Sequence, residues 1–433
     1  MSPDDAPLQE RARSAGVILD RIKDENVLRI YKATLLIGVA YGISLSLTPL
    51  HLNDNHFAKT DIGTLAAWFA GGIVLLSLPM GALIRRFSAR AALILSLVGY
   101  AACVTIFPHL KTYNTIAIAR FFDGAFSVGL WVCCETILLS RADHANKAFI
   151  TSLYAMAMAI GYVVGPILAK QIVAHFPTWT AFAASGVLAT GAAVYLLLRL
   201  DGDVPETHAH TQPGDAGHQD APLSAHAKSS ILWRIKTSCF ATFAYGYFQA
   251  SVVLFLPLYL IEVKHVPREN TILTTAFFAA GMLLFSNIAG RMGDRLGHLR
   301  VMRVLGIVGT TMILSFMWLD SFVLMCVAVF VAGATLASIS PVSLALQGVV
   351  TRPHEYSRSN AIYNVFYALG MLLGPWVSSI VAVRFTSSIM ISHLAGLWLV
   401  FIFFSVVFAN DDPAARRRKQ VAPVQAAVAD DPT

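Results

Sequence analysis

The sequence predicts an all-α membrane protein with twelve transmembrane helices, arranged in two pseudo-symmetric halves of six. Three observations predict this fold. Hydrophobic residues make up 56% of the 433 positions and charged residues only 13%, about half of the roughly 25% that is typical of soluble domains. Twelve apolar runs are each long enough to cross a bilayer, which takes ~20 residues of helix. The second six runs also repeat residues of the first six in register.

This composition excludes an ordinary soluble enzyme, because so few charges could not cover so much apolar surface. The net charge of +7 does not indicate nucleic-acid binding, because the basic residues lie at the ends of apolar runs. All five cysteines lie inside apolar runs, with spacings that suit neither disulfides nor zinc. We therefore predict no cofactor and no metal site in the helical part of the chain.

The chain divides into five segments by composition. A polar tail covers residues 1–27, six apolar runs fill 28–198, a polar linker covers 199–230, six further runs fill 231–408, and a second tail covers 409–433. The first six runs are expected near residues 28–51, 62–84, 89–108, 115–139, 148–170 and 179–198. The second six are expected near residues 233–262, 270–290, 299–319, 321–347, 357–382 and 387–408. Runs of this length satisfy their own backbone in lipid as helices.

The linker is rich in small polar residues and has no apolar period, as expected of a flexible connection between two halves. It carries four histidines at irregular spacing: His208, His210, His218 and His226. A metal-binding tract and a plain solvated linker both remain open. A short N-terminal stretch, residues 8–27, is either an amphipathic surface helix or a disordered tail.

The distribution of basic residues predicts the orientation. With twelve spans both termini and the linker share one side, and that side holds most of the 32 Lys and Arg residues. The opposite side carries only Lys59, Lys111, Lys170, Lys264, Arg268 and Arg384. The basic side is expected to be cytoplasmic, in a bacterial-type inner membrane.

The internal repeat is the strongest signal. Positions 209 residues apart carry the same residue at many places along the two halves. The matched pairs are Gly81 and Gly290, Arg86 and Arg295, Gly124 and Gly333, Tyr154 and Tyr363, Gly161 and Gly370, Gly165 and Gly374, and Pro166 and Pro375. Two six-helix halves in the same orientation imply a pseudo-twofold axis along the membrane normal and a cavity between the halves near mid-depth.

Three motifs resemble those of the major facilitator superfamily. The segment 290–300 has the pattern of the family's loop signature: Gly290, then Asp294-Arg295, Gly297 and the basic Arg300. Its first-half copy is degraded, because Arg85 replaces the acid and Ser88 replaces the second glycine. Arg120 and Gly124 resemble the fourth-span motif. Gly161, Gly165 and Pro166 resemble part of the fifth-span motif that is common in exporters.

The resemblance implies a twelve-span transporter that alternates between two conformations. In the family the loop signature latches the cytoplasmic ends in one state, so Gly290, Asp294, Arg295, Gly297, Arg300 and Arg86 are the expected latch. The alternative is that these basic residues only hold the loop in the cytoplasm. The Gly-xxx-Gly-Pro sequences of the fifth and eleventh spans are expected to pack helices closely and to bend them.

The fourth span offers the candidates for proton coupling. Arg120, Asp123 and Glu135 share one face with Ser127 and Trp131 at the helical period. Ionisable groups inside a membrane are costly and usually face a cavity or a partner. Arg120 and Asp123 are spaced to pair. The alternative is a structural ion pair, with Glu135 at the cytoplasmic interface.

Further cavity candidates are polar or aromatic residues of three other spans. They are Tyr41 in the first span, Tyr245 and Gln249 in the seventh, and Asn360, Tyr363, Asn364 and Tyr367 in the eleventh. The last four are spaced to form one hydrogen-bonding wall.

The sequence therefore predicts a monomeric, proton-coupled secondary transporter of a small molecule, with efflux of an amphipathic compound as the expected direction. Uptake of a sugar, carboxylate or vitamin is the alternative within transport. A transport-inactive sensor on the same scaffold is a third hypothesis. A membrane enzyme is disfavoured, because no cluster of nucleophile, carboxylates or metal ligands is visible outside the linker.

Overall fold

The computed structural model describes residues 24–141, 147–201, 230–352 and 355–413. In these ranges it contains twelve helices that are long and apolar enough to cross a membrane, and it contains no strands. The predicted fold class is confirmed. The linker histidines and the N-terminal stretch up to residue 23 lie outside the described residues, so the expectations about them stay predictions.

The six helices of the first half run a few residues past the apolar runs at most of their ends. They are α2 (Glu25–Asp54), α3 (Lys59–Phe87), α4 (Ala89–Ile106), α5 (Tyr113–Ser140), α6 (Lys147–His175) and α7 (Thr178–Arg199). Polar caps place two of the starts: Asp24 accepts a hydrogen bond from the Asn26 amide at 2.8 Å, and Thr112 caps α5. A short 3-10 turn, η2 (Phe107–His109), extends α4.

The second half has the same plan with one interruption. Its elements are α8 (Ile231–Glu262), α9 (Arg268–Thr271), α10 (Leu273–Leu296), α11 (His298–Ser315), α12 (Phe322–Ala332), α13 (Ser338–Val350), α14 (Tyr356–Arg384), α15 (Ser387–Val407) and the turn η6 (Ala409–Asp411). The expected span 321–347 is split, because a π-helical segment, η4 (Gly333–Ala337), separates α12 from α13. Such segments widen one helical turn and often occur at functional sites.

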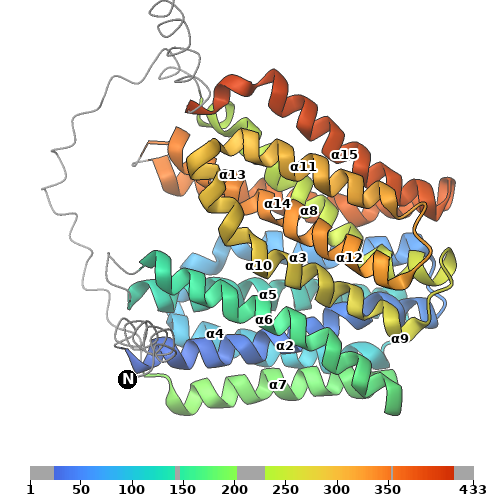
Figure 1. Ribbon diagram of the computed structural model, residues 1–433. Coiled ribbons are helices and arrows are strands. Elements are labelled where there is room, and N and C mark those ends of the chain that lie inside the picture. The colour runs from blue at the N-terminus through green and yellow to red at the C-terminus, as the bar shows by residue number, and fades with distance from the viewer. Residues whose placement is uncertain (1–23, 142–146, 202–229, 353–354, 414–433) are drawn as a thin grey trace, which may run out of the picture.

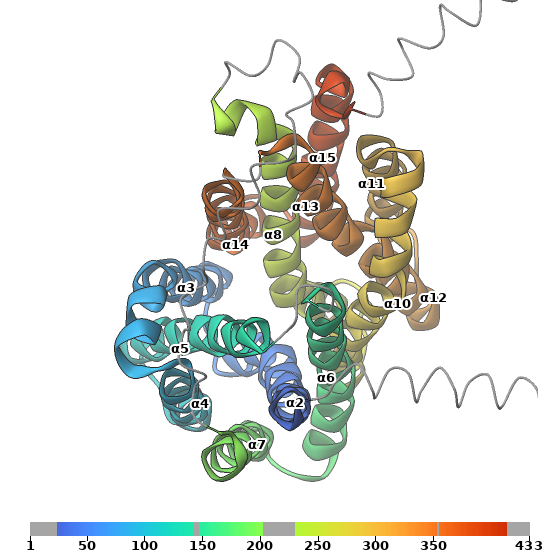
Figure 2. The same cartoon turned by 90° about the vertical axis from the view of Figure 1, so that its left-hand side faces the viewer.

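The two halves lie side by side and meet along three helix pairs. Figure 1 shows the first half in blue to green and the second half in yellow to red. The contacts between the halves involve α3 with α14, α6 with α10, and α2 with α8. Figure 2 views the molecule along its helices and shows these six elements surrounding the centre. This is the arrangement that a pseudo-twofold axis along the helices requires.

The repeat is preserved in the packing of the helices. A Cβ on Gly72 or Gly124 would collide with the backbone of the facing helix, at Phe121 and at Phe69 respectively. In the second half, 209 residues later, Gly281 lies against Phe330 and Gly333 against Phe278 in the same way. The glycines therefore permit the same close crossing in both copies.

The Gly-xxx-Gly-Pro sequences are packing sites in both halves, as expected. A Cβ on Gly165 would lie 2.6 Å from the Val39 carbonyl oxygen of α2, and Gly161 faces Gly38 on the same helix. Gly374 lies against Tyr247 and Ser251 of α8, and Gly370 lies one turn before it against the same helix. Pro166 and Pro375 are inside α6 and α14.

The loop signature makes the same turn in both halves. Gly297 has a φ of 98°, and Ser88, 209 residues earlier, has a φ of 78°. Glycine adopts this backbone region freely, whereas serine is strained there. Gly290 lies inside α10, where a Cβ would meet open space, so no close helix contact accounts for a glycine at this position.

Candidate functional site

A cavity of about 350 Å³ lies between the two halves at the middle of the spans. This volume is at the lower end of the ~300–1,000 Å³ range of ligand sites. The first half contributes Tyr41, Leu45, Thr48, Pro49, Ala66, Phe69, Ala70, Arg120, Trp131 and Tyr162. The second half contributes Tyr245, Gln249, Ala250, Val253, Leu254, Thr275, Phe278, Ala279, Met282, Tyr367, Met371 and Pro375. Six of the residues predicted for the cavity or for proton coupling are in this set: Tyr41, Arg120, Trp131, Tyr245, Gln249 and Tyr367.

The side of the cavity away from the chain termini is closed by polar contacts between the halves. Lys59 at the start of α3 donates to Glu262 at the end of α8, at 2.5 Å, and to Ser387 of α15, at 2.9 Å. Arg268 of α9 forms an ion pair with Asp54 at the end of α2. We call the two ion pairs, Lys59–Glu262 and Asp54–Arg268, the gate pairs.

On the side of the termini, the ion pairs in the described part of the chain each join residues of one half. Asp24 pairs with Arg141 at 3.0 Å, and Lys236 pairs with Asp411 at 2.7 Å. Burial works to raise the pKa of Asp24, but hydrogen bonds from Asn26 and Arg141 outweigh it and hold that pKa below its usual range. The ion pairs that join the two halves, Lys59–Glu262 and Asp54–Arg268, therefore lie on the side away from the termini in the part of the chain that the structure describes.

A buried ion pair lies on the wall of the cavity. The Arg120 Nη1 atom donates to the Asp123 Oδ2 atom at 2.5 Å, and both side chains are nearly inaccessible, with 13% and 12% of their surface exposed. The guanidinium also lies over the Phe69 ring, 4.3 Å from its centroid. Arg120 lines the cavity, whereas Asp123 lies behind it. The predicted pairing of these two residues is present.

A hydrogen-bonded network surrounds the ion pair. The Tyr41 hydroxyl donates to Ser127, and the Ser127 hydroxyl donates to the backbone carbonyl of Asp123 at 2.6 Å. The Tyr41 ring stacks on Tyr100, with centroids 4.9 Å apart. Ser127 is fully buried and does not line the cavity, because Tyr41 covers it. Among the described residues, the Asp123 Oδ1 atom has no hydrogen-bond partner.

Aromatic side chains form much of the remaining wall. Tyr245 and Tyr367 lie nearly parallel with centroids 5.9 Å apart, and the Tyr367 hydroxyl donates to the Gln249 Oε1 atom at 2.9 Å. Phe69 and Tyr162 also line the cavity, although the sequence analysis did not predict either of them as a cavity residue. Neither residue stands out from the other aromatic residues of its apolar span, so no signal in the sequence marked it.

The other predicted residues of α14 do not line this cavity. Tyr363 is buried and hydrogen-bonds Ser343 of α13 at 2.8 Å, so it packs inside the second half. Asn364 and Asn360 are exposed, one and two turns from Tyr367 toward the side of the termini. Of the predicted wall, only Tyr367 contributes to the cavity.

Glu135 lies one turn beyond Trp131, on the side of the termini, and its side chain is exposed. It forms no ion pair with a residue that the structure describes. The loop signature lies on the same side: Asp294 pairs with His298 within its own motif at 3.3 Å. Arg295, Arg300 and Arg86 are exposed.

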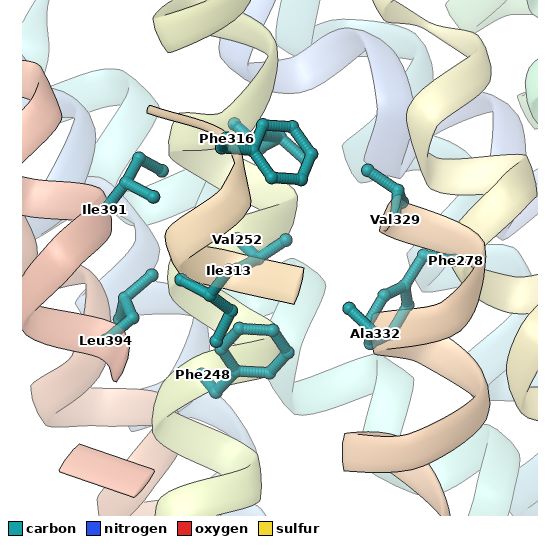
Figure 3. A pocket seen from close by; sticks show the side chains of 10 residues that line it. Phe248, Val252, Phe278, Ile313, Phe316, Val329, Ala332, Ile391 and Leu394 are labelled. Atoms are coloured by element: carbon teal, nitrogen blue, oxygen red, sulfur yellow. The ribbon is translucent and has the colours of Figure 1, made fainter. Parts of the chain in front are cut away.

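The second half has an apolar void where the first half has its ion pair. Val329 and Ala332 occupy the positions 209 residues after Arg120 and Asp123. Both line a small space of about 20 Å³, together with Phe278, the counterpart of Phe69. Figure 3 shows only apolar side chains pointing into it. The charged site therefore exists in one copy.

Comparisons with known proteins identify the architecture. The sequence profile of the Major Facilitator Superfamily matches residues 31–276 and 239–430. The uncharacterized MFS-type transporter YcaD of Shigella flexneri serotype 5b is 22% identical over 388 residues, which cover 89% of this chain and 97% of YcaD.

Solved structures share the fold. The nucleoside transporter NupG superposes with a TM-score of 0.73 at 12% identity, over 89% of this chain and 99% of NupG. A bacterial homologue of the human lysosomal transporter Spinster, in an inward-facing and occupied conformation, has a TM-score of 0.68 at 12% identity. That superposition covers 90% of this chain and 96% of the homologue.

Proposed function

The chain belongs to the Major Facilitator Superfamily, and we propose that it is a proton-coupled secondary active transporter that works by rocker-switch alternating access. One observation carries the proposal: a central cavity is sealed on one side by contacts between the halves and has a buried ion pair on its wall. Rocking of the halves would break these contacts and expose the same cavity to the other side.

We propose Asp123 as the proton carrier. A charge buried at this depth is costly unless it is paired, and Asp123 has a single charged partner in Arg120 and one oxygen without a hydrogen bond in the described chain. A proton on Asp123 would remove one charge and loosen its hold on Arg120. Glu135 is the second candidate, because it lies on the same helix face, one turn beyond the cavity.

The membrane orientation is also a proposal. The excess of Lys and Arg on the side of the termini supports a cytoplasmic location for that side, and the bacterial relatives support an inner membrane. With this orientation the gate pairs are periplasmic, and the cavity faces inward in the conformation described here. We propose that a monomer is the transporting unit, because each cavity is built from one chain.

The substrate is proposed to be a small amphipathic molecule, because aromatic rings and a few polar groups share the cavity wall. Efflux is the direction that the sequence predicts, and uptake is the alternative. The cation on the cavity wall suits an anion that crosses together with a proton, so we propose uptake as the direction. The exporter-like Gly161 and Gly165 make the same helix contacts as Gly370 and Gly374 in the second half. Their role in packing is thus common to both halves and favours neither direction.

The test is proton movement in liposomes that contain the purified protein and a pH-sensitive dye. A panel of drugs, nucleosides, sugars and organic acids is added to the wild type, to Asp123→Asn and to Glu135→Gln. We expect at least one compound to trigger proton movement in the wild type and in Glu135→Gln, and not in Asp123→Asn. The sign of the pH change gives the direction of exchange.

Three results would contradict parts of the proposal. Proton movement that survives in Asp123→Asn and is lost in Glu135→Gln would transfer the carrier role to Glu135. Compounds that bind without any movement of substrate or protons would favour a sensor on the transporter scaffold. Substrate movement without protons in all three proteins would leave a uniporter.

A further inference from the structure

The charged group that reaches the cavity is a cation. Arg120 is the only residue charged at neutral pH among those that line the cavity in the described part of the chain. Its partner Asp123 is 9% exposed and lies behind the wall. A ligand in the cavity therefore meets the guanidinium before it meets the carboxylate.

The guanidinium has donors to offer. It carries five N–H groups in a planar fork that fits a carboxylate. Within the described chain, these groups donate one hydrogen bond, to Asp123. The Phe69 ring holds the guanidinium plane from one side. The geometry suits the bidentate binding of an acidic group.

The rest of the wall suits flat rings. Trp131 and Tyr162 line the first half, and the parallel rings of Tyr245 and Tyr367 line the second. Aromatic rings bind other rings by stacking and by edge-to-face contacts. Gln249 adds one polar group, which is already held by Tyr367.

An anion on Arg120 would lie close to the Asp123 carboxylate, since both would share one guanidinium. Like charges at such a distance repel strongly in a low-dielectric interior, and a proton on Asp123 would remove the repulsion. The titratable or charged groups that interact with Asp123 are Tyr41 of α2, Tyr100 and Cys103 of α4, and Arg120 of its own helix. Among these groups, only Arg120 is charged, and its guanidinium would pair with both Asp123 and a bound anion.

We infer that the cavity takes an aromatic organic anion whose acidic group binds Arg120 while one proton neutralises Asp123. The anion and the proton then cross the membrane together without net charge, which favours uptake down an inward proton gradient. Val329 and Ala332 occupy the positions of Arg120 and Asp123 in the second half, so there is no second ion pair at the equivalent place. We therefore expect one anion to cross with one proton. This inference rests on the proposed transport function and names its substrate class.

The test is binding of three matched probes by calorimetry to the purified full-length protein. The probes are 2-naphthoate, 2-naphthamide and 2-naphthylmethylammonium, which share the naphthalene ring and carry a negative, a neutral and a positive substituent at the same position. We expect the wild type to prefer 2-naphthoate and to bind it more weakly as the pH rises from 5.5 to 7.5, by at most about tenfold per unit, because one proton must bind with it. In Asp123→Asn the affinity for 2-naphthoate should be high and independent of pH.

Variants of the cation complete the test. Arg120→Gln should bind 2-naphthoate about 10- to 100-fold more weakly, as expected for a lost charge-assisted hydrogen bond, and should bind 2-naphthamide unchanged. The double variant Arg120→Gln/Asp123→Asn leaves no unpaired buried charge, so it keeps the test valid if the single variant folds poorly. Like Arg120→Gln, it should bind 2-naphthoate weakly and 2-naphthamide as the wild type does. Lys111→Gln, which removes an exposed positive charge on the periplasmic side, is the control and should bind as the wild type does.

Three results would overturn the inference: a preference for the cationic probe, equal binding of acid and amide, or no binding of any probe. The experiments distinguish failure of the proposed anion site from failure of the proposed transport function. Proton movement triggered by a different compound in liposomes would leave the transporter standing without this substrate class. Binding of 2-naphthoate through Arg120 with no proton movement would keep the anion site and remove the coupling.

Discussion

The gate pairs should bias the protein toward the conformation that is closed on the side away from the termini. Replacing Glu262 and Arg268 by Gln removes the charge of one partner of each pair and keeps a polar side chain. The two pairs share no residue, so their effects should add. The ion pairs described on the side of the termini each lie within one half, so breaking the gate pairs should favour opening on the side away from the termini.

The magnitude follows from the exposure of the pairs. Lys59 and Glu262 have 24% and 35% of their side-chain surface exposed, and Arg268 and Asp54 have 28% and 42%. Pairs this accessible contribute ~0.2–1 kcal/mol each, after screening by water. The double variant should therefore shift the equilibrium by ~0.4–2 kcal/mol, or about 2- to 30-fold.

The assay is a distance distribution between two spin labels in reconstituted protein. The labels are introduced as unnatural amino acids at Lys111 in the first half and Trp318 in the second, both exposed on the side away from the termini. We expect the double variant to increase the population with the longer separation. High salt should move the wild type the same way, because surface charges are screened within ~3 Å at 1 M salt.

A matched control is Lys264→Gln, which removes an ion pair with Asp320 on the same side but within one half. It should leave the distance distribution unchanged. An unchanged distribution in the double variant, or an equal shift in the control, would refute the assignment of the gate.

Three further predictions concern stability, measured as thermal unfolding in detergent. Gly165→Ala should destabilise the protein by ~1–3 kcal/mol, because the new Cβ would lie 2.6 Å from the backbone of α2, whereas Gly191→Ala in α7 meets open space and should not. Ser88→Gly should stabilise it by about 1 kcal/mol, since relief of strain at a φ of 78° exceeds the lost cap and the added chain entropy; Ser88→Ala should destabilise instead. Asp24→Asn should lower stability at pH 7, and its difference from the wild type should vanish as the pH falls below ~4. The sign follows from the lowered pKa of Asp24 in the folded protein. The Asp24 carboxylate stabilises the fold fully above the pKa that it has in the unfolded chain, and this stabilisation is lost as the pH falls through the lower pKa of the folded state.

The helices and the repeat could be predicted from the sequence because they rest on local or periodic signals. Span length follows from runs of apolar residues, and the Gly-xxx-Gly-Pro sites repeat in register. The pairing of Arg120 with Asp123 follows from their spacing of three on a helix. Ser88 was readable as the degraded copy of Gly297, and it makes the same turn.

The faces of the helices could not be predicted in the same way. Tyr363 and Tyr367 are one turn apart on α14, yet one packs on α13 and the other lines the cavity. A helix that is apolar nearly all round gives no stripe to indicate which side meets its neighbours. The gate pair Lys59–Glu262 joins residues 203 positions apart, and only the packing of the halves brings them together.

The most direct test of the account is accumulation driven by a pH gradient alone. Protein is reconstituted in liposomes with the membrane potential held at zero, and the interior is made alkaline relative to the medium. With a substrate from the proton-flux panel, the wild type should concentrate it against its gradient. Asp123→Asn should exchange labelled for unlabelled substrate but should not concentrate it. Accumulation by Asp123→Asn at the wild-type level would contradict the central role of this carboxylate.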